Sequence, residues 1–148
     1  MSNALIQNRK AHFNYEFVEK YMAGIELVGQ EVRSVRSGRG NLEGSYVVIR
    51  GREAFLINSE VPAYQVKNTP ADYDPRRTRK LLLTKKEIDT LAGQEKKGLT
   101  IIPIAMYNMG KKIKIEIALA KGKKSFDKRE SIKKRESDRD LQRTLKGE

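Results

Sequence analysis

The most constraining feature of the sequence is a regular alternation of apolar and polar or small residues over 112–119. The apolar positions are Ile113, Ile115, Ile117 and Leu119. A period of two residues predicts a strand with one buried face. The apolar run 99–107 precedes this strand, and the residues Asn108, Met109 and Gly110 predict a turn between them. Residues 99–119 are therefore predicted to form an antiparallel hairpin.

Further strands are predicted in the first half of the chain. The apolar runs 46–49 and 54–57 are separated by a short polar turn, which is the pattern of a second hairpin. Residues 13–32 alternate imperfectly and are interrupted at Ala23 and Gly24. This interruption predicts two strands joined at a bend.

Two helical segments are predicted, one short and one longer. Residues 31–37 place Val32 and Val35 three positions apart, which predicts one or two helical turns. Thr84 and Glu87 have the spacing of a capping box, in which each residue satisfies the other's backbone amide, so a longer helix should begin there. The apolar face of that helix would consist of Ile88, Leu91 and Ala92, with Gly98 at its end.

These elements together predict a mainly β fold. Residues 62–80 contain three prolines and end in a cluster of basic residues, so they are predicted to form a long basic loop. About six strands with one main helix and a short helical turn favour an antiparallel barrel, because closure removes exposed sheet edges. The oligonucleotide-binding (OB) type of barrel is the natural candidate. We expect this barrel domain to comprise residues 1–122, followed by a basic tail over 123–148.

The charge of the chain indicates the class of its partner. Thirty-one Lys and Arg residues against nineteen Asp and Glu residues give a formal net charge of +12, which favours a polyanion such as nucleic acid. The sequence has no 18-residue apolar run, lipidation motif or secretory signal, so we expect a cytoplasmic protein that does not bind membranes. Cysteine is absent and His12 is the only histidine. We therefore expect no metal site, no cofactor and no catalytic residue.

The C-terminal segment has a composition of its own. From Lys121 onward, eleven Lys and Arg residues stand against six Asp and Glu residues, with few large apolar groups among them. Such a segment cannot bury enough apolar surface to fold alone. Because no proline interrupts it, we expect it to be disordered in the free protein and helical on a surface that neutralises it.

Several stretches of the sequence resemble a known family. They are 8–11 (NRKA) with Tyr15, 23–25 (AGI), 29–38 (GQEVRSVRSG), 41–42 (NL) with Ser45 and Tyr46, 74–83 (DPRRTRKLLL), and 120–124 (AKGKK) with 127–129 (DKR). In order and spacing these stretches resemble the SsrA-binding protein family (small protein B, SmpB). The resemblance covers nearly the whole chain.

This resemblance implies both a fold and a function. It implies an OB-type barrel that binds transfer-messenger RNA (tmRNA, SsrA RNA) at the elbow of its tRNA-like part. It also implies a role in trans-translation, the rescue of stalled ribosomes and tagging of the nascent chain, with no chemistry performed by the protein. The further partners implied are small-subunit RNA at the decoding centre and mRNA channel, and indirectly elongation factor Tu on charged tmRNA.

The residue types at these positions suit RNA binding on physical grounds as well. Cations neutralise phosphates and an aromatic ring stacks on bases. Leu81, Leu82 and Leu83 cannot all face one core, so one of them, taken as Leu82, could contact an unstacked base. Glu31 could form a surface ion pair with Arg33 or accept hydrogen bonds from base edges. The candidates for the tmRNA face are Asn8, Arg9, Lys10, Tyr15, Glu31, Arg33, Arg76, Arg77, Arg79, Lys80 and Leu82.

The tail supplies a second set of candidates. By resemblance, it would run as a helix along the vacant mRNA channel of the ribosome. Its candidate contacts are Lys123, Lys124, Asp127, Lys128, Arg129, Lys133, Lys134 and Arg135. On residue types alone, an ordinary solvated basic tail remains the alternative.

The chain departs from the family pattern at a few positions. Met22 stands where a glutamate is expected, so the role of that acidic residue cannot be carried over. His12 lies one place early, and Phe13 could supply a stacking surface instead. Thr84 replaces a frequent His or Asn, and Ser137 lies near a position where some tails have tryptophan.

Two other functions are compatible with a basic β domain. One is an initiation-factor-like barrel that binds the small ribosomal subunit without a dedicated RNA. The other is an RNA-modifying or RNA-cleaving enzyme, which would need a carboxylate cluster or a nucleophile with its base. The acidic residues of this chain are instead scattered singly among basic ones.

Overall fold

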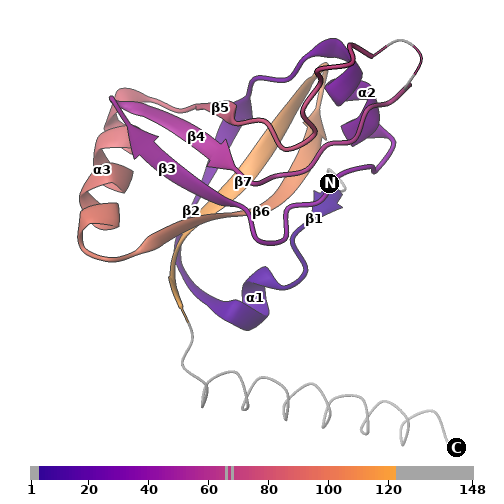
Figure 1. The fold of residues 1–148 in the computed structure, drawn as a ribbon. Helices are drawn as coiled ribbons and strands as arrows, with labels where there is room; N and C mark the ends of the chain where they lie inside the picture. The colour runs from indigo at the N-terminus through magenta and orange to yellow at the C-terminus, as the bar shows by residue number, and fades with distance from the viewer. Residues whose placement is uncertain (1–3, 66, 68, 123–148) are drawn as a thin grey trace, which may run out of the picture.

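The computed structural model describes residues 4–65, 67 and 69–122 of the chain. Seven strands and three helices lie in this part (Figure 1). They are β1 (Ala4–Gln7), α1 (Ala11–Asn14), β2 (Tyr15–Ile25), α2 (Gly29–Arg36), β3 (Tyr46–Arg50), β4 (Glu53–Ile57), β5 (Arg79–Leu82), α3 (Lys85–Lys96), β6 (Thr100–Met109) and β7 (Lys112–Gly122). The expectations for residues 123–148, including disorder and helix formation, concern a segment outside the described residues.

The strands form one antiparallel sheet that closes on itself. Its order is β1-β6-β3-β4-β5-β2-β7, and β7 pairs again with β6. Six strands, β2 to β7, therefore make a ring, and β1 adds to β6 outside it. The prediction of a mainly β, closed antiparallel fold of OB type is confirmed.

Individual strands differ from the sequence prediction. The two strands expected over 13–32 are one strand, β2, which pairs continuously with β7 apart from a shift between Phe17 and Glu19. Gly24 does not break β2, because its backbone pairs with both Leu82 and Lys114. The prediction that residues 62–80 form a loop was wrong at the C-terminal end of this range, since β5 begins at Arg79. The predicted count of six strands is one below the seven observed, because the merged pair offsets only one of the two missed strands, β1 and β5.

The hairpins and the main helix follow the sequence pattern. Thr84 Oγ1 accepts a hydrogen bond from the Glu87 amide at 3.2 Å, and the Thr84 amide donates to Glu87 Oε1 at 3.0 Å. At the other end, Gly98 has φ +93° and the Leu99 amide donates to the Gln94 carbonyl, as in a Schellman motif. The predicted capping box and glycine stop of α3 are confirmed.

The core fills the inside of the ring. The alternating residues of β7 point inward, and Ile115 and Ile117 are fully buried. The small residues Ala118 and Ala120 face the other way and pack with Ile102 into a second cluster beneath β1 and α1. Both faces of β7 are therefore covered near its C-terminal end.

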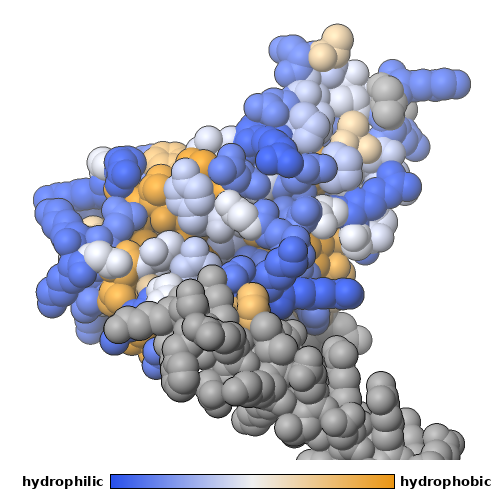
Figure 2. All heavy atoms as spheres, turned by 60° about the horizontal axis from the view of Figure 1, so that its bottom comes forward, coloured by the Kyte–Doolittle hydropathy of each residue, from blue (hydrophilic) through white to orange (hydrophobic). Residues whose placement is uncertain are grey.

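Hydrophilic side chains dominate the surface. Figure 2 shows them over most of the visible part of the described surface, with hydrophobic side chains gathered mainly on one side. Among the described residues, no helix is long and apolar enough to cross a bilayer. In the part of the chain that the structure describes, the exposed large apolar residues are Val18, Met22, Val28, Tyr46, Leu82 and Met109.

Candidate nucleic-acid interface

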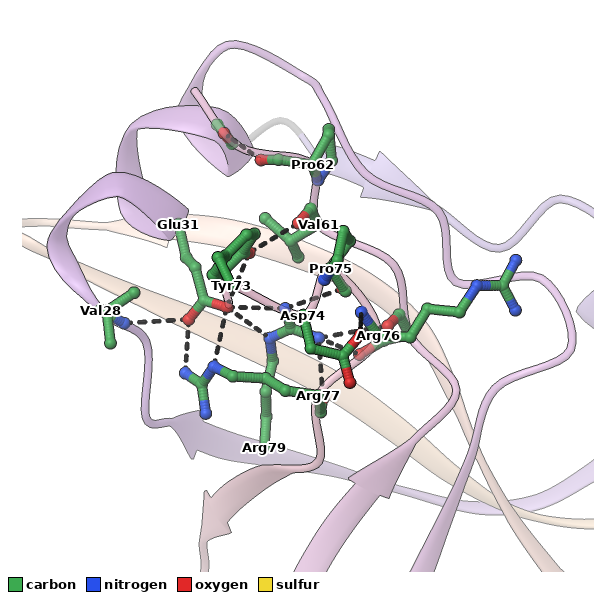
Figure 3. A network of polar contacts seen from close by, with 12 residues as sticks. Val28, Glu31, Val61, Pro62, Tyr73, Asp74, Pro75, Arg76, Arg77 and Arg79 are labelled. Atoms are coloured by element: carbon green, nitrogen blue, oxygen red, sulfur yellow. Dashed lines mark hydrogen bonds and ion pairs between the residues drawn. The ribbon is translucent and has the colours of Figure 1, made fainter. Parts of the chain in front are cut away.

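A buried carboxylate joins α2 to the segment that precedes β5. Glu31 is fully buried in the first turn of α2, where its Oε1 accepts a hydrogen bond from the Val28 amide at 3.0 Å (Figure 3). Arg77 donates to both carboxylate oxygens, with its Nε 2.9 Å from Oε2. Arg79 donates to Oε2 from Nε at 3.1 Å and from a terminal nitrogen at 2.6 Å. Two arginines thus share one carboxylate.

The remaining donors of Arg79 are also used. Its other terminal nitrogen donates to the Ser59 carbonyl at 3.2 Å and to the Ser59 hydroxyl at 3.1 Å. Further bonds run to the carbonyls of Arg77 and Pro75, both at 3.0 Å. A buried guanidinium is tolerated only when its charge and its donors are satisfied, and this one meets both conditions.

Tyr73 completes the cluster from the loop side. Its hydroxyl lies 2.7 Å from the Val61 carbonyl and 3.1 Å from Glu31 Oε2, so its single proton can serve either acceptor. Burial raises the pKa of Tyr73, and the neighbouring Glu31 carboxylate raises it further. The cluster therefore anchors the proline-containing loop to α2.

The carboxyl group of Glu31 is held in its ionised form. Burial acts to raise its pKa, but hydrogen bonds from Arg77, the Val28 amide and Arg79 outweigh that effect and lower the pKa below its ordinary value of 4.5. The hydrogen bond to Glu31 raises the pKa of the Arg77 guanidinium.

This pKa shift predicts a pH dependence of stability. Because the folded pKa is lowered, the contribution of Glu31 is fully present above the ordinary value of 4.5 and is lost as pH falls through the folded pKa. We expect the free energy of unfolding, measured in urea, to fall as the pH is lowered from 4.5 through the folded pKa of Glu31. Glu31→Gln should remove part of this slope, and an unchanged slope in that variant would contradict the assignment.

The cluster corrects two sequence-based interpretations. Glu31 does not form a surface pair with Arg33, since its partners are Arg77 and Arg79. Arg79 is fully buried, so in this conformation it does not belong to an exposed phosphate-binding patch. The sequence placed four cations together, but it could not show that the strand β5 turns one of them inward.

The other cations of this region remain accessible. Arg33 is exposed on α2, and Arg76 is exposed while its guanidinium lies 3.1 Å from Glu60. Arg77 is partly exposed beside the cluster. Lys80 is half-buried on β5 and lies 3.4 Å from Glu53 on the neighbouring strand. Exposed ion pairs of this kind are weak, so a phosphate can replace the carboxylate partner.

The N-terminal candidates separate into two surfaces. Asn8 is buried, and its side-chain amide donates to the Pro103 carbonyl at 2.9 Å, which fixes the chain where β1 ends. Asn8, Lys10 and Tyr15 line a groove of about 440 Å³ that also contains Tyr46. Arg9 is exposed and lines a different groove beside β1. The structure therefore brings three of these four residues together.

Two neighbouring aromatic residues lie near this groove without lining it. The His12 ring packs against Phe17, with ring centroids 4.5 Å apart, and the Lys20 ammonium lies 5.8 Å from the Phe17 centroid. Phe13, named as an alternative stacking residue, is half-buried. The exposed position of His12 fits a surface role.

Leu82 lies at the surface, as expected for one residue of the triplet. Its side chain is 51% exposed, whereas Leu81 is buried and Leu83 is half-buried. A groove of about 330 Å³ beside it is also lined by Lys111, Lys112 and Lys114. These three lysines were not among the predicted site residues, because the alternation of β7 identified only its buried face.

The described residues contain no group of three or more His, Cys, Asp or Glu side chains that could hold a metal ion.

The tail candidates Lys123, Lys124, Asp127, Lys128, Arg129, Lys133, Lys134 and Arg135 lie outside the described residues. The candidate interface in the described part consists of the exposed cations and the three grooves. It offers charge and apolar contact surface for a polyanion.

Comparisons with known proteins agree with this arrangement. A family model described as "SmpB protein" matches residues 5–147. The chain is 51% identical over 143 residues to the SsrA-binding protein of Gloeothece citriformis, covering 96% of this chain and 92% of the relative. It is 48% identical over the same length to the SsrA-binding protein of Microcystis aeruginosa, with coverage of 96% and 93%.

A solved structure is similar in fold as well as in sequence. Its description reads "tmRNA-SmpB: a journey to the center of the bacterial ribosome", and the chain is 41% identical to the matched protein, with a TM-score of 0.68. The match covers 85% of this chain and 92% of the other.

Proposed function

The chain belongs to the SmpB family, and we propose from this that it binds tmRNA and acts with it in trans-translation on stalled ribosomes. The observation that carries the proposal is the extent of the family match, residues 5–147, which includes both the ring and the basic C-terminal segment. A barrel without a dedicated RNA would account for the ring but not for a match that continues through the tail.

Two parts of the chain have different roles in this proposal. The ring, within residues 1–122, holds the tRNA-like part of tmRNA through its exposed cations and apolar contacts. Residues 123–148 bind ribosomal RNA at the decoding centre and along the mRNA channel. The chain associates with elongation factor Tu only indirectly, through charged tmRNA. A net charge of +12 supports both contacts, because each neutralised phosphate releases counterions.

The role proposed is that of an RNA-binding factor and not of an enzyme. Among the described residues, the carboxylates of Glu60 and Glu53 each pair with one cation, and that of Glu31 is held by two arginines. Chemistry on RNA would need a metal-binding cluster or a nucleophile next to its base. We also propose a cytoplasmic location, where stalled ribosomes are found.

The proposal is tested by comparing two RNAs. Gel-shift titrations with tmRNA and with an ordinary elongator tRNA, at the same salt concentration, should give clearly tighter binding of tmRNA. Competition with unlabelled RNA would check that the difference is specific and not an effect of RNA length. Equal affinity for both RNAs would favour the initiation-factor-like alternative.

The exposed arginines should contribute through phosphates. Arg33→Ala combined with Arg76→Ala should weaken tmRNA binding and lower the slope of log K against log salt by about 1.5, at roughly 0.7–0.9 per lost phosphate contact. Arg77 is left intact because its loss would also disturb the Glu31 cluster. The matched control is Lys96→Ala with Lys97→Ala, two exposed lysines at the end of α3. An unchanged slope in the arginine variant would contradict this assignment.

A further inference from the structure

The turn between β1 and α1 exposes two cations between two buried ends. Asn8 and Ala11 are buried, whereas Arg9 and Lys10 between them are exposed. The Ala11 amide donates to the Asn8 carbonyl at 3.2 Å, which closes a four-residue turn. Lys10 has φ −86° and ψ −6°, close to the values of about −90° and 0° at the third position of a type I turn. The turn is therefore a defined structure and not a loose connection.

The first residue of the turn is bonded to an irregularity in β6. Between Pro103 and Ala105 the pairing of β6 with β7 shifts, because β6 has one additional residue there, Ile104. The Asn8 backbone amide donates to the Ile104 carbonyl at 2.8 Å, and the Asn8 side-chain amide donates to the Pro103 carbonyl at 2.9 Å. A single residue thus bonds two consecutive carbonyls at this bulge.

The strand that leads into the turn is fixed from its other side. Gly40, in the segment before β3, has φ +152°, and a Cβ atom placed on it would lie 2.5 Å from Ile6 Cδ1. The absence of a side chain at Gly40 lets Ile6 pack into the core at this point. Because β1 is held between this segment and β6, the bonds of Asn8 set the direction in which the turn leaves the strand.

The two cations of the turn line different grooves. Arg9 lines the groove beside β1, together with Gly38 and Gly40. Lys10 lines the groove that contains Tyr15 and Tyr46. The Lys10 ammonium lies 3.9 Å from the Glu43 carboxylate, an exposed pair that a phosphate can replace. Neighbouring residues of one turn are thus directed at two separate parts of the surface.

From this geometry we propose that Asn8 is a positioning residue for RNA binding. Its buried side chain does not touch RNA. Its two bonds to β6 hold the turn so that Arg9 and Lys10 meet phosphates at two separate places on the RNA. Cations held in place before binding lose less conformational freedom on association, so they contribute more affinity than the same cations on a mobile segment. This inference rests on the proposed function in taking tmRNA as the partner, and it replaces the expectation that Asn8 contacts tmRNA.

A double-mutant cycle tests whether Asn8 acts through its two neighbours. The cycle consists of the unmodified full chain, Asn8→Ala, Arg9→Ala with Lys10→Ala, and all three substitutions together, each titrated with tmRNA at several salt concentrations. The cation variant should lower the slope of log K against log salt by about 1.5, at roughly 0.7–0.9 per lost phosphate contact. Asn8→Ala should weaken binding about fivefold, and the triple variant should bind like the cation variant, because coupled residues are not additive.

Three results of the cycle would overturn the proposal. They are a further fivefold loss in the triple variant, an unchanged affinity in Asn8→Ala, and an unchanged affinity in the cation variant. The matched control is Gln7→Ala, which removes an exposed side-chain amide one residue earlier and should leave tmRNA binding unchanged. Asn8→Asp is the second variant if Asn8→Ala does not fold, since it keeps the size of the side chain but replaces the donating group with an oxygen.

Hydrogen exchange separates positioning from a general loss of stability. The Ala11 amide, which closes the turn, should exchange faster in the Asn8 variant than in the unmodified chain. The Glu87 amide, which is bonded to Thr84 at the start of α3, should exchange at its original rate. Equal acceleration of both amides would show that Asn8 supports the fold as a whole and would overturn the proposal.

The cycle and the comparison of tmRNA with tRNA fail independently. If the unmodified chain prefers tmRNA but the losses in the triple variant are additive, the positioning role is wrong and the proposed function stands. If the chain does not prefer tmRNA but the losses are not additive, the positioning role stands and the proposed function fails.

Discussion

Glu31→Gln is expected to lower the free energy of unfolding by about 3–5 kcal/mol, the usual cost of removing one partner from a buried ion pair. The glutamine keeps the shape of the side chain but leaves Arg79, which is fully buried, without a counter-charge. Small domains are stable by only about 5–15 kcal/mol, so the variant should be close to unfolding. Urea denaturation followed by circular dichroism measures the effect.

A control variant and a rescue variant test this prediction. Asp89→Asn removes an exposed carboxylate from α3 and should change stability by no more than about 0.5 kcal/mol. Glu31→Leu with Arg79→Met removes both buried charges, so it should be more stable than Glu31→Gln if that variant suffers from an unpaired charge. A loss below about 1 kcal/mol in Glu31→Gln would show that the cluster is not a main support of the fold.

Removal of residues 127–148 is expected to abolish tagging on stalled ribosomes while leaving tmRNA binding nearly intact. The removed segment contains eight Lys and Arg residues but also six Asp and Glu residues. Its net charge is therefore small, and its loss should change the electrostatic attraction to RNA little. The two readouts are a gel shift with tmRNA and the yield of tagged peptide.

The binding measurement also serves as the control for folding of the shortened chain. If truncation removed tmRNA affinity together with tagging, the proposed division between ring and tail would be wrong. If tagging persisted at the full rate, the tail would have no required role on the ribosome.

The fold could be predicted from sequence where hydrophobic periodicity was strong. The alternation in β7 and the capping box at Thr84 were sufficient, because each is a pattern of residue types within a few positions of the chain. β5 was missed, since it is short and begins with Arg79 and Lys80, residues that normally indicate a solvated loop. Its place in the sheet is set by pairing with β2 and β4, which are distant in sequence.

The candidate site was less predictable than the fold, because its residues are brought together by contacts between distant parts of the sequence. Residue type suggested that Glu31 and Arg79 face solvent, whereas their long-range pairing buries both. The rule that three consecutive residues cannot all face one core predicted that one of the leucines 81–83 lies at the surface, and the structure shows that it is Leu82. Lys111 was missed because only the three-dimensional fold brings the β6–β7 turn next to Leu82.

The most direct test of the proposed role is a reconstituted tagging reaction with stalled ribosomes, charged tmRNA and elongation factor Tu. The measured quantity is the fraction of nascent chain that carries the tag, with and without the full chain. We expect tagging to depend on the chain and to increase with its concentration until tmRNA is saturated. Equal tagging in its absence, or no tagging while tmRNA is fully bound, would contradict the proposed function.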